Sequence, residues 1–106
     1  AQQNSERVVA IQALYEEMKQ SIHEITHSQY TVHLLDAIFS KPIFRTSDLA
    51  EQLSRDFGIH EKTTSSLLRQ LRDGGVLREL QAASGRRPAT LCFPRLINLA
   101  EGRDVL

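Results

Sequence analysis

The apolar positions of the first 27 residues follow the period of one long helix. No glycine or proline interrupts residues 5–27, and apolar side chains recur at alternating steps of three and four: Val8, Ile11, Tyr15, Met18, Ile22 and Ile25. This seam is shorter than the roughly three to four heptads that argue for a coiled coil. We therefore favour a helix that packs on its own domain. The alternatives are that it pairs with a second copy in a homodimer or lies on a neighbouring domain.

Two shorter helices are predicted next, each with one apolar face. Thr31 is placed to cap the first, which ends at Lys41 because a residue before proline is pushed out of helical geometry. Thr46 is placed to cap the second, TSDLAEQLSRDF. The inward positions in the two helices are Leu34, Leu35, Ile38, Phe39, Leu49, Ala50, Leu53 and Phe57.

A third helix follows a short turn at Gly58, Ile59 and His60. It has the sequence EKTTSSLLRQLRD, and Gly74-Gly75 is expected to end it. Positions i, i+3, i+4 and i+7 form its buried face: Thr64, Leu67, Leu68 and Leu71. Two helices joined by a turn of this kind are typical of a helix-turn-helix.

Two β-prone runs, residues 76–80 and 89–93, predict a hairpin with Arg86 and Arg87 at its tip. The chain is therefore expected to be mainly α-helical with a small β wing. We predict a winged helix-turn-helix over residues 29–94, with a three-helix core and a β hairpin. The long helix of residues 1–28 precedes it. A tail, residues 95–106, follows with one or two helical turns through Leu96, Ile97 and Leu99 and a stop near Gly102.

The chain has no net charge, but its charge is unevenly distributed. Residues 1–53 carry a net charge of −3 and residues 54–106 a net charge of +3, so the basic excess coincides with the last core helix and the hairpin. The length of 106 residues fits one domain, and a single cysteine excludes an internal disulfide. No apolar run approaches the ~18 residues of a membrane span, so we expect a cytoplasmic protein. The start at Ala1, without Met, suggests a piece of a longer protein.

The polar side of the last core helix is a candidate DNA-binding face. Short polar side chains let the backbone approach DNA, and longer donors select bases or grip phosphates. The side chains of the helix that meet this description are Lys62, Thr63, Ser66, Arg69 and Gln70. Arg86 and Arg87 of the hairpin are expected to support them. Double-stranded DNA is the favoured partner. Because Glu61 and Asp73 lie on the same helix, the alternative is a non-enzymatic module that binds protein.

A possible metal motif competes with this interpretation. His23-Glu24-Ile25-Thr26-His27 matches HExxH, and His33 stands where a longer zinc-protease motif has its third ligand. That motif needs a glycine where this chain has Tyr30, and Ile25 already belongs to the apolar seam. We therefore expect three solvent-facing histidines and no metal site. No other catalytic pattern or cofactor motif is found, and Cys92 is expected to be an unreactive strand residue.

Several segments resemble the C-terminal winged-helix region of Fic-domain proteins and, more broadly, the winged helices of bacterial transcription regulators. They are ERVVAIQALYEEM, LLDAIFSKPIFRTSDLAEQL, KTTSSLLRQLRDGGVLREL and FPRLINLAEG, with Leu68, Leu71, Gly75 and Leu77 at the family's apolar and glycine positions. In that family a separate domain transfers AMP to protein hydroxyls with a motif resembling H-x-F-x-x-G-N-G-R, which this chain lacks. The resemblance implies an accessory or regulatory domain without the enzyme. The first helix would then be the segment that leaves the Fic catalytic domain.

Overall fold

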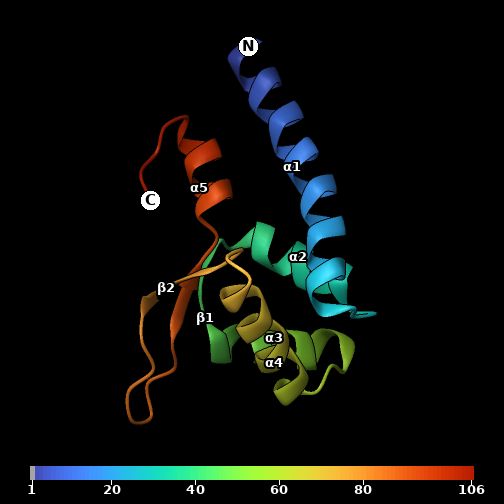
Figure 1. Ribbon diagram of the computed structural model, residues 1–106, viewed down its shortest axis with the longest axis vertical. Coiled ribbons are helices and arrows are strands. Elements are labelled where there is room, and N and C mark those ends of the chain that lie inside the picture. The colour runs from blue at the N-terminus through green and yellow to red at the C-terminus, as the bar shows by residue number, and fades with distance from the viewer. Residues whose placement is uncertain (1) are drawn as a thin grey trace.

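The computed structural model describes residues 2–106, with side chains from residue 6 onward. Over this range the chain is mainly helical and has a small sheet (Figure 1). The elements in chain order are α1 (Gln2–Thr26), α2 (Thr31–Ser40), β1 (Ile43–Arg45), α3 (Thr46–Phe57), α4 (Glu61–Asp73), β2 (Arg78–Gln81), β3 (Thr90–Cys92) and α5 (Pro94–Glu101). The predicted helical core with a β hairpin is confirmed.

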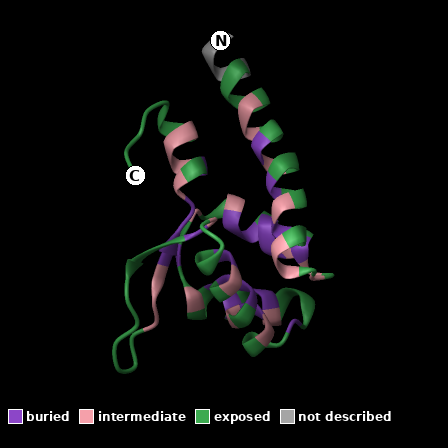
Figure 2. Ribbon diagram, in the orientation of Figure 1, coloured by how far each residue is buried: buried purple, intermediate pink, exposed green. Residues whose placement is uncertain are grey.

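The core lies where α1, α2, α3, α4 and the sheet meet (Figure 2). From α1 it takes Leu14, Met18 and Ile22, which are buried against the apolar faces of the shorter helices. Three other members of the α1 seam, Ile11, Tyr15 and Ile25, are partly buried and pack on this core, whereas Val8 is 53 % exposed. Most of the apolar seam therefore packs on the domain itself, as the favoured interpretation expected.

The predicted caps of α2 and α3 were wrong. Thr31 is the first helical residue of α2 rather than its cap, and its hydroxyl donates a hydrogen bond of 2.8 Å to the carbonyl oxygen of Ser28. Thr46 likewise begins α3, and the capping position belongs to Arg45, whose backbone is extended. Neither helix has a side-chain cap. In both helices the threonine, a residue type that often caps helices, is instead part of the first helical turn.

Phe57 does not face the core as predicted. It is 53 % exposed and stacks on the imidazole of His33 from α2, with ring centroids 4.1 Å apart. Phe57 is the last residue of α3, and Gly58 turns the chain immediately afterwards in a left-handed conformation (φ 70°). Helical spacing extends the apolar face to this residue, but the core ends one turn earlier, at the buried Leu53.

The sheet contains a strand that the sequence pattern did not predict. Its order is β1-β3-β2, antiparallel throughout, so β1 pairs with the hairpin strand that is farthest from it in sequence. Phe44 of β1 pairs with Leu91 of β3, and both side chains are buried. The first hairpin strand begins two residues later than predicted, because Val76 and Leu77 donate backbone hydrogen bonds to Leu71 and close the end of α4. β3 lies within its predicted run.

The chain ends in a two-turn helix, as predicted. Pro94 occupies the first turn of α5, and Gly102 caps its end in a left-handed conformation (φ 75°). Figure 1 shows α5 beside α1, on the opposite side of the sheet from the hairpin tip. The hairpin and α5 therefore extend in opposite directions from the core.

Candidate nucleic-acid interface

The turn between α3 and α4 fixes where the candidate DNA-binding helix begins. Gly58 donates a backbone hydrogen bond of 2.9 Å to Ser54, and the next residue, Ile59, is buried in the core. His60 then caps α4, because its Nδ1 accepts a hydrogen bond of 3.1 Å from the backbone N–H of Lys62. This cap was missed, since histidine is not among the residue types that usually cap helices. It holds Lys62 and Thr63 in the first turn.

The polar face of α4 is arranged as its spacing predicted. Lys62, Ser66 and Arg69 are exposed, while Thr63 and Gln70 are partly buried at the edges of the face. The amide of Gln70 donates a hydrogen bond of 3.3 Å to the Ser66 hydroxyl. The opposite side, with Thr64, Leu67, Leu68 and Leu71, is buried as predicted. These five polar side chains thus share one accessible side of the helix.

The hairpin lies beside this face, and Arg69 marks the junction. A groove of about 260 Å³ is lined by Ser65 and Arg69 of α4, by Thr46 at the start of α3, and by Ala83, Pro88 and Ala89 of the hairpin. A backbone hydrogen bond of 3.0 Å from Thr46 to Ala89 ties α3 to the hairpin base. The sequence pattern did not reveal Thr46 as a neighbour of Arg69, because the groove joins segments far apart in the chain, and Ser65, one turn before Arg69 on α4, was not among the predicted residues.

The two arginines of the loop are carried at its exposed tip. Ser84 and Arg87 exchange backbone hydrogen bonds of 3.0 and 2.9 Å, and Gly85 between them adopts φ 57°. The Arg87 guanidinium donates to the carbonyl oxygen of Ala82 at 3.4 Å. Figure 1 shows that this loop projects to the side of α3 and α4, away from the helical core. The loop that carries Arg86 and Arg87 is therefore exposed to solvent.

The cations of this surface are free of carboxylate partners within the described part of the chain. No ion pair there involves Lys62, Arg69, Arg86 or Arg87. Arg72, by contrast, pairs with Asp73 at 3.2 Å and Glu79 at 3.4 Å. The negative charge of Asp73, at the C-terminal end of α4, is thus paired with Arg72. Glu61, in the first turn of α4, is an exposed negative charge.

The HExxH segment lies at the end of α1 and is not helical throughout. α1 ends at Thr26, and His27 follows it with a left-handed backbone (φ 50°); the His27 ring lies edge-to-face with the His23 ring, with ring centroids 6.2 Å apart. His33 was expected to face solvent, but it is partly buried under Phe57. Among the described residues, no group of three or more His, Cys, Asp or Glu side chains is positioned to hold a metal ion.

Cys92 is a free and buried cysteine. It is fully buried in β3, and burial raises the pKa of its thiol. A raised thiol pKa disfavours the nucleophilic thiolate.

Across residues 2–106 there is no helix with the length and apolar character needed to cross a bilayer.

Residues 14–87 match the family described as protein adenylyltransferase SoFic-like, C-terminal domain. The chain belongs to this family. The match runs from the middle of α1 to the hairpin tip, so the SoFic-like C-terminal domain includes both the α4 face and Arg86 and Arg87. No curated protein matches the chain. The predicted relation to the C-terminal part of Fic-type proteins is confirmed, and the chain is an accessory part of such a protein.

Proposed function

We propose that this domain binds double-stranded DNA, with α4 in the major groove and the hairpin tip on the adjacent backbone or minor groove. The observation that carries the proposal is the exposed row Lys62, Ser66 and Arg69 beside the hairpin, whose cations have no carboxylate partner in the described chain. As part of a Fic-type protein in the bacterial cytoplasm, the domain is not itself an enzyme and targets or regulates the AMP-transferring part.

The side chains divide into two roles by length and chemistry. Lys62, Arg69, Arg86 and Arg87 place positive charges where phosphates pass, and such contacts release condensed counterions. Ser66 is short enough to let the helix approach the base edges. Thr63 and Gln70 flank it as hydrogen-bonding groups, and glutamine pairs well with the major-groove edge of adenine. Affinity therefore comes mainly from the four cations and selectivity from the three neutral side chains.

The experiment is a titration of a labelled 20-base-pair duplex, followed by fluorescence anisotropy at salt concentrations between 50 and 200 mM. We expect the double variant Lys62→Ala/Arg69→Ala to bind at least tenfold more weakly and to lose about two units of the slope of log K against log[salt]. Arg103→Ala is the control for the single variants Lys62→Ala and Arg69→Ala, because each of the three removes one positive charge and Arg103 lies in the exposed tail beyond α5.

Three outcomes would count against the proposal. Wild-type binding weaker than the ~10⁻⁴ M limit of non-specific association at low salt would refute it. An equal loss of affinity in Arg103→Ala would show that net charge alone matters. Binding of a protein partner with little response to salt would favour the alternative, an interaction module with an apolar interface.

A further inference from the structure

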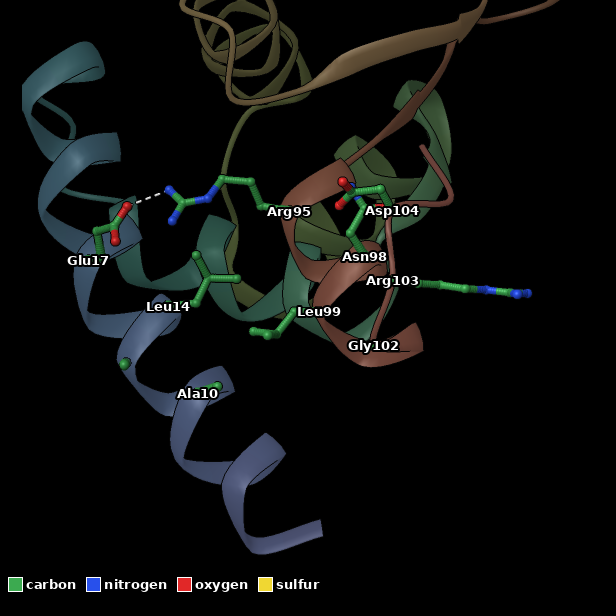
Figure 3. Close-up of a pocket in the computed structure, with 10 residues that line it drawn as sticks. Ala10, Leu14, Glu17, Arg95, Asn98, Leu99, Gly102, Arg103 and Asp104 are labelled. Carbon is green, nitrogen blue, oxygen red and sulfur yellow. Dashed lines mark hydrogen bonds and ion pairs between the residues drawn. The ribbon is translucent and has the colours of Figure 1, made fainter. Parts of the chain in front are cut away.

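The N-terminal half of α1 and α5 enclose a second surface that DNA binding does not use. Between the two helices lies an open groove of about 650 Å³ (Figure 3). Leu14 and Leu99 point into it from opposite sides, and Ala10 and Ala13 form part of the α1 wall. Glu17 and Arg95 close one end with an ion pair that lowers the pKa of the Glu17 carboxyl. The groove is therefore apolar inside and charged at its rim.

The apolar surface continues around α1 beyond the groove. Ala10 and Ala13 also line a shallow depression of about 370 Å³ together with Val9 and Glu6. Val9 is 64 % exposed, and this half of α1 extends away from the rest of the molecule (Figures 1 and 2). We call the combined surface of Val9, Ala10, Ala13, Leu14 and Leu99 the α1–α5 groove. Exposed valine beside two alanines leaves a flat apolar patch against which another surface can pack closely.

The family match indicates what covers this surface. It begins at Leu14, which is also the first residue of α1 to be buried among the described side chains. Residues 6–13 thus lie outside the matched domain, and the family is by its description the C-terminal domain of a longer polypeptide. We propose that the α1–α5 groove is the docking site of the domain that precedes it in the same polypeptide. This inference rests on the family membership and is independent of DNA binding.

A tethered domain fits the size of the groove better than a second copy does. A stable dimer between free molecules needs about 1,200–2,000 Å² of buried surface, whereas the apolar part here comprises only five side chains. A domain joined directly to α1 is held at a high effective concentration, so a smaller interface suffices. A modest apolar centre with a charged rim, such as Glu17 and Arg95, is also typical of contacts between domains of one chain.

Two neighbouring valines provide a matched test in the full-length polypeptide. Val9→Asp places a charge in the α1–α5 groove, while Val8→Asp makes the same change at a 53 % exposed valine that lines neither depression. We expect Val9→Asp to weaken docking roughly tenfold or more. Hydrogen exchange should then become faster by a similar factor across residues 8–13 and 99–104, and small-angle scattering should show a larger radius of gyration. Val8→Asp should leave both quantities unchanged.

Each other outcome overturns the proposal. If exchange and radius of gyration are the same in wild type and Val9→Asp, nothing docks in the groove. If Val8→Asp has an equal effect, the interface is the α1 seam rather than the groove. If sedimentation shows a dimer that Val9→Asp dissociates, a second copy is the occupant. Duplex DNA affinity, measured on the same variants, should not change, so failure of either proposal is recognised separately.

Discussion

At the scale of single residues, two buried threonines differ in how their hydroxyl groups are satisfied. Thr31 is 6 % exposed and its hydroxyl donates to the carbonyl oxygen of Ser28, whereas Thr64 is fully buried and, among the described residues, its hydroxyl has no partner. A buried polar atom without a hydrogen bond loses its hydration without compensation. The threonine hydroxyl therefore contributes to the stability of the fold at position 31 and lowers it at position 64.

We predict opposite effects for the same substitution at these two positions. Thr64→Val removes an unsatisfied hydroxyl at constant shape and should stabilise the fold by about 1 kcal/mol, while Thr31→Val should destabilise it by about 1 kcal/mol. Urea denaturation followed by circular dichroism measures both. A loss of stability in Thr64→Val would mean that an internal water or an alternative rotamer satisfies this hydroxyl.

Tyr15 makes stability depend on pH in the alkaline range. Its hydroxyl donates a hydrogen bond of 2.6 Å to Asp36, and this bond, with smaller contributions from burial and charge, raises its pKa from 10.0 to about 12. Because the folded state holds the proton more tightly, this stabilisation is complete below pH 10 and is lost as the pH rises towards 12. We expect Tyr15→Phe to be less stable at pH 8 and the difference to shrink above pH 10. The difference in absorbance at 295 nm between wild type and Tyr15→Phe, in which the contribution of Tyr30 cancels, should show the Tyr15 phenolate forming near pH 12, and a midpoint near 10 would contradict this prediction.

At the scale of elements, the helical period of apolar residues predicted the features that depend on residues close together in the sequence. It placed the buried faces of α2 and α4 and most of α1, because each depends on residues three and four apart in one segment. It could not place β1, a three-residue strand that exists only because Phe44 pairs with Leu91 across the sheet. The helical period also did not predict the exposure of Phe57, because the position where a core ends depends on segments far away in the sequence. The groove between α4 and the hairpin is also a tertiary feature that spacing alone could not reveal.

The hairpin loop provides a test that leaves the fold intact. Arg86 and Arg87 are exposed, and the loop is closed by backbone hydrogen bonds between Ser84 and Arg87 that do not need either side chain. We expect Arg86→Ala/Arg87→Ala to keep the wild-type melting temperature, to weaken duplex binding several-fold and to flatten its salt dependence by up to about two units. Unchanged DNA binding in this variant would confine the interface to α4.

At the scale of the whole molecule, the two proposed binding surfaces lie at opposite ends of the core. The candidate DNA-binding face and the hairpin tip lie on one side, while the α1–α5 groove lies on the other (Figure 1). The two surfaces share one core, so a groove held in a fixed position relative to α4 requires that α1 and the helices α2, α3 and α4 form one rigid unit.

That requirement predicts how the molecule unfolds. Ile22 of α1 is 1 % exposed in the shared core, so Ile22→Val should cost about 0.5–1.5 kcal/mol and Ile22→Ala about 2–5 kcal/mol. If α1 belongs to the unit, helical circular dichroism and the fluorescence of Tyr15, measured with Tyr30→Phe present so that no other tyrosine contributes, should give one coincident transition in both variants. Val8→Ala, at an exposed position of the same helix, should change stability by less than about 0.5 kcal/mol. An early transition seen only by Tyr15 would mean that α1 detaches separately, and a surface on α1 would then not be held in place relative to α4, the proposed DNA-binding helix.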